Sequence, residues 1–168
     1  LENISPSDSA SLLLWGMTLA DSYLEQGQKE KAIKSYDRVL DTHPDYRFAL
    51  LNRALLNYES GNTEAAVEDL DHQLKNDPTD NTALYSRATI YVKDNQLDKA
   101  QKDISVLEST TTQKQKVVPL KRDYTKKMNT EIKNKKAAEK QLQQNPNNLP
   151  ALNALSESCI RIGDYQTA

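Results

Sequence analysis

The sequence lacks the features that mark a disulfide-stabilised or membrane-spanning protein. It has one cysteine, Cys159, so no disulfide can form within the chain. The most apolar window, residues 11–20, is shorter than the roughly 18 residues that a membrane span needs, and it lacks the pattern of a signal peptide. Because the sequence begins at Leu1, a removed signal stays open. The compartment is not identified, but a soluble protein is expected, with the cytoplasm favoured over a periplasmic or secreted location.

Motifs for catalysis and for cofactor binding are also missing. The sequence has no Gly-rich phosphate loop, no H-E-x-x-H, no C-x-x-C and no nucleophile elbow. His43 and His72 have no cysteine or histidine at metal-ligand spacing. Acidic residues such as Glu68, Asp69 and Asp71 are expected on a solvated helix face. We therefore predict no enzyme, no catalytic residue, no cofactor and no metal site.

Glycine is scarce, with four in 168 residues, yet three of the four share one spacing. A constant 34-residue step from Gly27 reaches Gly61, Asn95, Asn129 and Gly163. Glycine and asparagine adopt positive φ most easily, and a helix that ends and folds back needs this conformation at its C-terminus. The spacing predicts a helix turn at each of these positions.

Small residues and prolines recur at the same interval. Five residues after the turns stand Ala32, Ala66, Ala100, Asn134 and Ala168, and seven residues before them stand Ala20, Ala54, Ala88, Arg122 and Ser156. Small side chains let two helices approach closely where they cross. The units end at Pro44, Pro78, Thr112 and Pro146, and proline stops a helix. Each unit is therefore predicted to contain a helix, a tight turn, a second helix and a stop.

This pattern resembles the tetratricopeptide repeat family, whose 34-residue unit reads W-x2-L-G-x2-Y, then A-x3-F, then P. The first unit carries Gly16-x2-Leu19-Ala20-x2-Tyr23, then Ala32-x3-Tyr36, then Pro44. The next two units carry Leu50-x2-Arg53-Ala54 with Ala66-x3-Leu70, and Leu84-x2-Arg87-Ala88 with Ala100-x3-Ile104. The resemblance implies an all-α, right-handed α-α superhelix, a solenoid of stacked helix-turn-helix repeats.

We predict one such solenoid over residues 1–168. Its expected parts are an N-terminal helix extension (1–12), three repeats (13–46, 47–80 and 81–114), a divergent segment (115–148) and a partial fifth repeat (149–168). In the divergent segment, Leu120, Tyr124, Met128 and Ile132 follow one another at a spacing of four. This segment is therefore either a helix pair or one long helix, and Pro119 suits its first turn.

The sequence also predicts the structure near each end of the chain. Ser5, Pro6 and Asp8 predict a helix start, so the first helix is expected over about residues 6–26. The closing GDYQTA resembles the family's turn into a second helix, and the chain ends inside that unit. This favours a fragment of a longer protein. The alternatives are that the helix before Gly163 caps the array or associates with another copy.

The family resemblance implies that the first helix of each repeat lines a concave groove for peptides or partner helices. Phe48, Leu51, Leu55, Tyr58 and Tyr85 would form an apolar patch there, and exposed apolar clusters tend to mark binding sites. The full candidate partner-binding set is Met17, Asp21, Phe48, Leu51, Asn52, Leu55, Tyr58, Tyr85 and Thr89; Leu14, Leu24 and Val92 also fall on this face. The alternative is that the groove is narrow and these residues pack on one another.

One subclass of the family grips C-terminal carboxylates with Lys, Asn and Arg side chains. Asn52 fits that pattern, but Met17, Asp21, Thr82 and Ser86 do not. Asp21 would repel a carboxylate, so no such clamp is predicted. We predict a non-enzymatic scaffold that binds a protein or peptide, with no membrane insertion.

Charge is distributed unevenly along the chain. Residues 1–110 carry 11 basic and 19 acidic side chains, whereas residues 111–168 carry 11 basic and 5 acidic ones. Residues 114–136 alone hold nine basic groups against Asp123 and Glu131. An alternative function is therefore an electrostatic module that binds nucleic acid or an acidic partner through this segment. Only Tyr124 interleaves the lysines, which disfavours nucleic acid.

Overall fold

The structure, a computed structural model, describes residues 9–112 and 114–164, and in these residues it contains helices and no strand. This confirms the all-α class predicted from the sequence. The helices are α1 (Ser9–Glu25), α2 (Lys29–Thr42), α3 (Arg47–Glu59), α4 (Thr63–Asn76), α5 (Asn81–Lys93), α6 (Leu97–Thr110), α7 (Lys114–Gln144) and α8 (Leu149–Ile162). They form two compact units, one ending at Ser86 and one beginning at Arg87, so the division falls within α5.

The turns between paired helices lie where the 34-residue spacing predicts them. Gly27, Gly61, Asn95 and Gly163 have φ angles of 71°, 86°, 61° and 75°. At Gly27 the amide donates to the carbonyl of Leu24 and the amide of Gln28 donates to that of Tyr23, and the same arrangement recurs at the other three turns. Such paired bonds satisfy the last carbonyl groups of the preceding helix.

The proline positions also fit the prediction. Helices α2, α4 and α7 end at Thr42, Asn76 and Gln144, two residues before Pro44, Pro78 and Pro146. Proline disfavours helical backbone in the residue before it, which accounts for this common offset.

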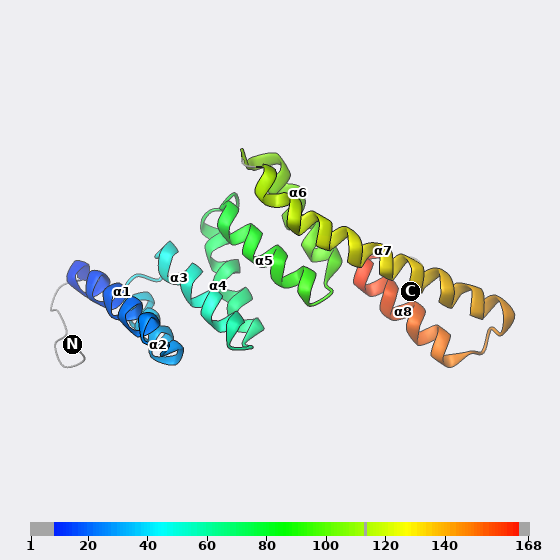
Figure 1. Ribbon diagram of the computed structural model, residues 1–168, viewed down its shortest axis with the longest axis horizontal. Helices are drawn as coiled ribbons and strands as arrows, with labels where there is room; N and C mark the ends of the chain where they lie inside the picture. Colours follow the sequence, from blue (N-terminus) through cyan, green and yellow to red (C-terminus); the bar gives the residue numbers. More distant parts are fainter. Residues whose placement is uncertain (1–8, 113, 165–168) are drawn as a thin grey trace. The chain divides into compact units, whose positions relative to one another are not determined.

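In the first unit, α1 lies along α2 and α3 lies along α4, with α2 against α3 (Figure 1). The regularly spaced alanines stand at the crossings, and Ala20, Ala32 and Ala66 are fully buried. At Gly16 an added Cβ would lie only 2.5 Å from a methyl of Val39. The small residues therefore allow the close approach of helix pairs that the sequence predicts.

In the second unit, α7 packs on both α6 and α8, and α8 also contacts α6 (Figure 1). Leu107 of α6, Val117 and Ala138 of α7, and Ala151 and Cys159 of α8 are buried in it.

Residues 114–144 form one continuous helix of 31 residues, so the divergent segment contains no turn. Of the two alternatives for this segment, a helix pair and one long helix, the structure shows the long helix, and Asn129 lies inside α7. Pro119 is also not in the first turn, since α7 begins at Lys114. Apolar residues spaced by four drift around a helix by about 40° per step. Leu120 is accordingly buried, while Ile132 is 37% exposed and Glu131 occupies the packed side in its place.

The predictions about the chain ends lie outside the described residues. These are the helix start at Ser5, Pro6 and Asp8, and the second helix of the fifth repeat, which would include Ala168. The described part of the first helix begins at Ser9. The repeat boundaries at 12, 46, 80, 114 and 148 stay predictions.

Candidate functional site

An exposed apolar surface lies on α3, on the side away from its packed face. Phe48 and Leu55 are 54% and 55% exposed, whereas Leu50 and Ala54 of the same helix are buried. Since residues seven apart return to nearly the same side of a helix, Phe48 and Leu55 share one face. Leu51, Asn52 and Tyr58 are half-buried beside them. We call Phe48, Leu51, Asn52, Leu55 and Tyr58 the α3 patch.

The N-terminal end of the α3 patch is held by aromatic and charged neighbours. The ring centroids of Phe48 and Tyr46 lie 5.8 Å apart, and the Arg47 guanidinium lies 5.5 Å from the Phe48 ring. Arg47 is fixed in turn by two hydrogen bonds to Asp80, at 2.5 and 2.9 Å. Phe48 is therefore exposed, but its neighbours Tyr46 and Arg47 are held in place by these contacts.

Asp80 links this region to the start of α5. Its carboxylate accepts hydrogen bonds from the backbone amides of Thr82 and Ala83, which caps the helix. Burial acts to raise the pKa of Asp80, but the hydrogen bonds from Arg47 and from these amides outweigh it and lower the pKa. Asp80 thus remains charged.

Two predicted polar residues, Asp21 and Asn52, both lie near the hydroxyl of Tyr36. This hydroxyl is buried and makes no hydrogen bond within the described residues. Burial raises the pKa of Tyr36, and the negative charge of Asp21 raises it further. The amide of Asn52 is near enough to offset part of this rise, although it lies outside hydrogen-bonding geometry. The structure therefore brings polar groups from α1 and α3 to one buried phenol of α2.

The other predicted site residues are spread over both units. Met17 is half-buried and packs against the core of the first unit, and Tyr85 of α5 is 36% exposed. Thr89 is half-buried and belongs to the second unit. Val92, which the sequence places on the same face, is only 3% exposed. The expectation that Val92 contributes to the surface is therefore wrong.

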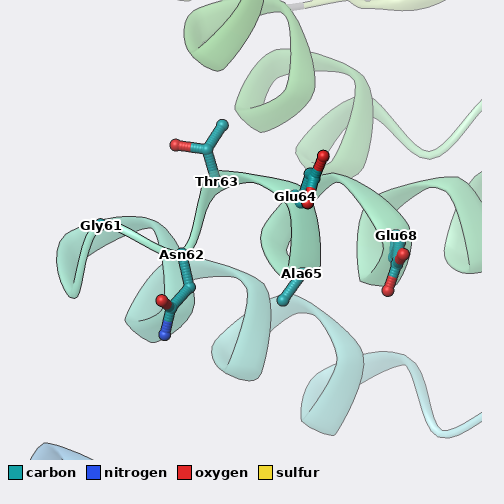
Figure 2. Close-up of a pocket in the computed structure, with 6 residues that line it drawn as sticks. All are labelled: Gly61, Asn62, Thr63, Glu64, Ala65 and Glu68. Carbon is teal, nitrogen blue, oxygen red and sulfur yellow. The ribbon is translucent and has the colours of Figure 1, made fainter.

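A shallow pocket opens at the start of α4, and Figure 2 shows its lining residues. They are Gly61, Asn62, Thr63, Glu64, Ala65 and Glu68. A helix N-terminus attracts anions, but the carboxylates of Glu64 and Glu68 would repel them. We therefore assign no ligand to this pocket.

The basic segment 114–136 forms most of α7, and its cations differ in their surroundings. Lys121 pairs with Glu108, Lys127 donates to the carbonyl of Lys93 at 2.8 Å, and Lys135 pairs with Asp164. Lys126 and Lys133 are exposed. The segment is therefore a helix with one packed side and one solvated, cationic side.

Buried ion pairs are the polar feature that the sequence reasoning missed. Asp69, expected on a solvated face, is 5% exposed and accepts two hydrogen bonds from Arg53 of α3, at 3.0 and 2.6 Å. Arg87 and Asp103 make the same pair in the second unit. The signal was present, because the arginine and the aspartate both recur at the 34-residue interval.

A second buried polar cluster surrounds Glu131 of α7. Its carboxylate accepts from Asn95 at 2.8 Å and from Ser158 at 3.2 Å, and Arg161 lies 3.5 Å away. Burial acts to raise the pKa of Glu131, but these hydrogen bonds and the charge of Arg161 lower it. The cluster ties the α5–α6 turn and α8 to α7.

Residues 9–112 and 114–164 lack metal-binding clusters and membrane-spanning helices. No group of three or more His, Cys, Asp or Glu side chains there could hold a metal ion. None of the helices in these ranges has the length and apolar character needed to cross a bilayer. His72 lies 2.8 Å from Asp45, and its side chain is 41% exposed.

Comparison with known proteins identifies the repeat. Residues 19–90 match the sequence model of the tetratricopeptide repeat. No curated protein matches the chain.

Several solved structures share the fold. A tetratricopeptide repeat protein from Parabacteroides merdae ATCC 43184 has a TM-score of 0.67 at 21% identity, over 97% of this chain and 62% of that one. This chain thus spans less than two thirds of that protein. MamA 41-end from Desulfovibrio magneticus RS-1 has a TM-score of 0.61 at 16% identity, over 93% and 88% of the two chains. The first such domain of Spaghetti (RPAP3), bound to the HSP90 peptide SRMEEVD, has a TM-score of 0.55 at 18% identity, over 93% and 96%.

These findings agree with the helix pairs and with the positive-φ turns at 34-residue intervals. The predicted fold class, an all-α tetratricopeptide repeat solenoid, is confirmed. Proteins of this family are generally non-catalytic scaffolds for protein–protein interaction. Residues 19–90 of this chain therefore carry the tetratricopeptide repeat, and the chain shares the fold of tetratricopeptide repeat proteins.

Proposed function

We propose that the chain is a non-enzymatic interaction module that binds a peptide or helix of a partner protein on the α3 patch. The observation that supports this most directly is the exposure of Phe48 and Leu55, each more than half exposed on one helix face. Burying large apolar side chains is the main source of affinity in such contacts. Apolar anchors of the partner would cover these two residues.

Polar groups beside the apolar residues would fix the orientation of the bound partner segment. Asn52 lies on the same side of α3 as Phe48 and Leu55, and its amide can both donate to and accept from a partner's backbone. Tyr85, 36% exposed at the start of α5, adds a further amphipathic contact. Met17, Asp21, Leu51 and Tyr58 complete the proposed set in the first unit, and the role of Thr89, which belongs to the second unit, stays a prediction.

The chemistry argues against a carboxylate end as the ligand. The first such domain of Spaghetti (RPAP3) is bound to the HSP90 peptide SRMEEVD, and one subclass of the family grips the carboxylate at the C-terminus of a peptide. Here Asp21 is exposed and would repel such a group. We therefore propose an internal, apolar peptide segment or helix as the ligand.

A peptide selection tests this proposal. A random 12-residue phage library is selected on the full chain, and the affinities of enriched peptides are measured by fluorescence anisotropy. The variant L55E/Y85E should lose at least tenfold in affinity, because it places charge in the proposed contact. The matched control is L149E/I160E, which changes two exposed apolar residues of α8, 70% and 53% exposed. It should bind within twofold of the wild type.

Salt gives a second criterion. Binding on an apolar patch should change by less than threefold between 50 and 500 mM NaCl, since screening acts on charges. Selected peptides that bind L55E/Y85E as tightly as the wild type would show that the α3 patch is not the site.

A further inference from the structure

The outward side of α7 has a seven-residue repeat that its packing does not require. Three exposed positions follow one another at this interval as Val118, Thr125 and Ile132, and three lie four residues after them, Arg122, Asn129 and Lys136. A third exposed row, also at intervals of seven, holds Lys126, Lys133 and Lys140. We call these nine residues the α7 stripe. Its length is about 33 Å at 1.5 Å per residue.

Helix geometry places the stripe opposite the packed side of α7. At about 100° per residue, its members span an arc of roughly 120°. Leu120, Glu131 and Ala138, which are 4%, 6% and 3% exposed, lie on the other side, where α6 and α8 pack. The stripe is therefore a complete helix face that the described part of the second unit leaves uncovered.

The charge of this face is not neutralised within the unit. Among residues 9–112 and 114–164, no acidic side chain pairs with Lys126, Lys133, Lys136 or Lys140. Arg122 lies 3.6 Å from Asp123, and its side chain is 76% exposed. The other acidic residues of α7, Glu131 and Glu139, pair with Arg161 and Lys135, which are not part of the stripe. The stripe thus presents cations over most of its length.

The heptad pattern of the α7 stripe fits an acidic partner helix better than it fits another kind of anionic ligand. In a coiled-coil heptad, Val118, Thr125 and Ile132 take position d, Arg122, Asn129 and Lys136 take position a, and the lysine row takes position e. Position e pairs with charged residues of the facing helix, and a polar residue at a fixes its register. Val118 and Ile132, 59% and 37% exposed, offer apolar contact along the same seam.

A nucleic acid would not contact the apolar residues of the α7 stripe favourably. Phosphates need cations, but they gain nothing from Val118 or Ile132, and single strands need aromatic side chains on which bases stack. The only aromatic residue of α7 is Tyr124, which is half-buried.

We propose that the α7 stripe binds an acidic amphipathic helix of a partner protein, laid along α7 as in a two-stranded coiled coil. The partner would carry carboxylates opposite the lysine row and opposite Arg122 and Lys136, and apolar residues opposite Val118 and Ile132. Each exposed ion pair changes affinity by about fivefold or less. The complex is therefore of modest affinity and sensitive to salt. This proposal is independent of the α3 patch.

The test uses two synthetic peptides of four heptads and equal composition. The matched peptide has leucine at d, glutamate at a, e and g, and alanine elsewhere. The control peptide keeps leucine at d but has glutamate at b, c and f and alanine at a, e and g. Mutual repulsion of the glutamates keeps the matched peptide from pairing with itself. Binding of the fluorescein-labelled peptides to the full chain is measured by anisotropy at 50 and 500 mM NaCl.

The matched peptide should bind at least tenfold more tightly than the control peptide, and 500 mM NaCl should weaken it at least tenfold. The variant K126E/K133E/K140E should lose at least tenfold in affinity, and K126A/K133A/K140A should show a smaller loss. The matched control K34E/K75E/K102E reverses three exposed lysines of other helices and should bind within twofold of the wild type. V118S/I132S should lose about threefold with an unchanged salt dependence. Far-UV circular dichroism verifies that each variant is folded.

Three results would overturn the proposal. Equal binding of both peptides would indicate diffuse charge attraction with no helix pairing. A 20-base-pair DNA duplex that binds more tightly than the matched peptide, and is lost in K126E/K133E/K140E, would indicate nucleic acid. No binding of the matched peptide at 100 μM would exclude the site.

Discussion

Arg53 of α3 and Asp69 of α4 are joined by two parallel hydrogen bonds, Nε to Oδ2 at 3.0 Å and Nη2 to Oδ1 at 2.6 Å. Arg87 and Asp103, the equivalent residues of the next repeat, make the same pair at 2.9 and 2.6 Å. The two aspartates are 5% and 4% exposed. A buried pair of this geometry is costly to break, because the remaining partner keeps an uncompensated charge.

The first repeat has uncharged residues in place of this ion pair. Leu19 and Ser35 are its equivalents of Arg53 and Asp69 at the 34-residue interval, and both are buried. The same helix crossing therefore packs either with an ion pair or with an uncharged pair.

Replacing one partner alone should destabilise the first unit. Asp69→Ala should lower the free energy of unfolding by about 3 kcal/mol, because Arg53 remains partly buried and keeps the half-exposed Asp37 as its one carboxylate partner among the described residues. The double variant R53L/D69S, which copies the first repeat, should lose less than Asp69→Ala does. Urea unfolding followed by circular dichroism measures both. The single variants R53L and D69S complete the cycle, and if R53L/D69S loses as much stability as the two of them together, the pair does not act as a unit.

The 34-residue spacing of the turns was predictable from the sequence because each turn depends on the local backbone conformation. Positive φ at Gly27, Gly61, Asn95 and Gly163 is a requirement that few residue types meet. Asn129 shows the limit of this signal. Asparagine is less unfavourable than glycine in a helix interior, so its presence does not require a turn, and at Asn129 the chain continues as α7, which packs on α6 and α8.

Buried polar groups were harder to predict than the turns. A charged residue on a helix is usually solvated, so Asp69 was expected on the surface, and nothing in the sequence pattern marked Glu131 as buried. What places both inside is a partner from another helix, Arg53 in one case and Asn95 with Ser158 in the other. Only the 34-residue recurrence of Arg53 and Asp69 as Arg87 and Asp103 marks such a partner in the sequence.

The four turns should differ in their tolerance of a side chain. Gly61→Ala should cost about 1 kcal/mol, since an added Cβ meets nothing within 4 Å and only the positive φ opposes it. Gly163→Ala should cost more, because its Cβ would lie 2.9 Å from the Cβ of Asp98. Thermal unfolding of both variants gives the comparison. An equal loss at both positions would show that the contact with Asp98 relaxes freely.

Glu131 should make stability depend on pH in the acid range. Its pKa in the folded chain lies below the value of about 4.5 expected for the unfolded chain. The unfolded state therefore binds more protons in this window, so the stabilisation is present above about pH 4.5 and is lost as the pH falls through the folded pKa. Glu131→Gln should reduce stability at pH 7 more than at pH 3. Urea unfolding at both pH values tests this, and an equal loss at the two would contradict it.

Pro119 should weaken α7, because it lies five residues inside the helix with no backbone N–H. The carbonyl of Gln115 therefore lacks the donor that a helix normally supplies four residues later. Val117 and Leu120 on either side are each 4% exposed, so packing holds the segment helical in spite of this loss. Pro119→Ala should restore the donor and raise the free energy of unfolding by about 1 kcal/mol or more. The reverse change, Ala137→Pro at an exposed position of the same helix, should lower it by about 3 kcal/mol. Urea unfolding measures both variants, and amide exchange of residue 119 reports the new hydrogen bond directly. If Pro119→Ala left stability unchanged and its new amide exchanged freely, the first turns of α7 would not be helical in solution.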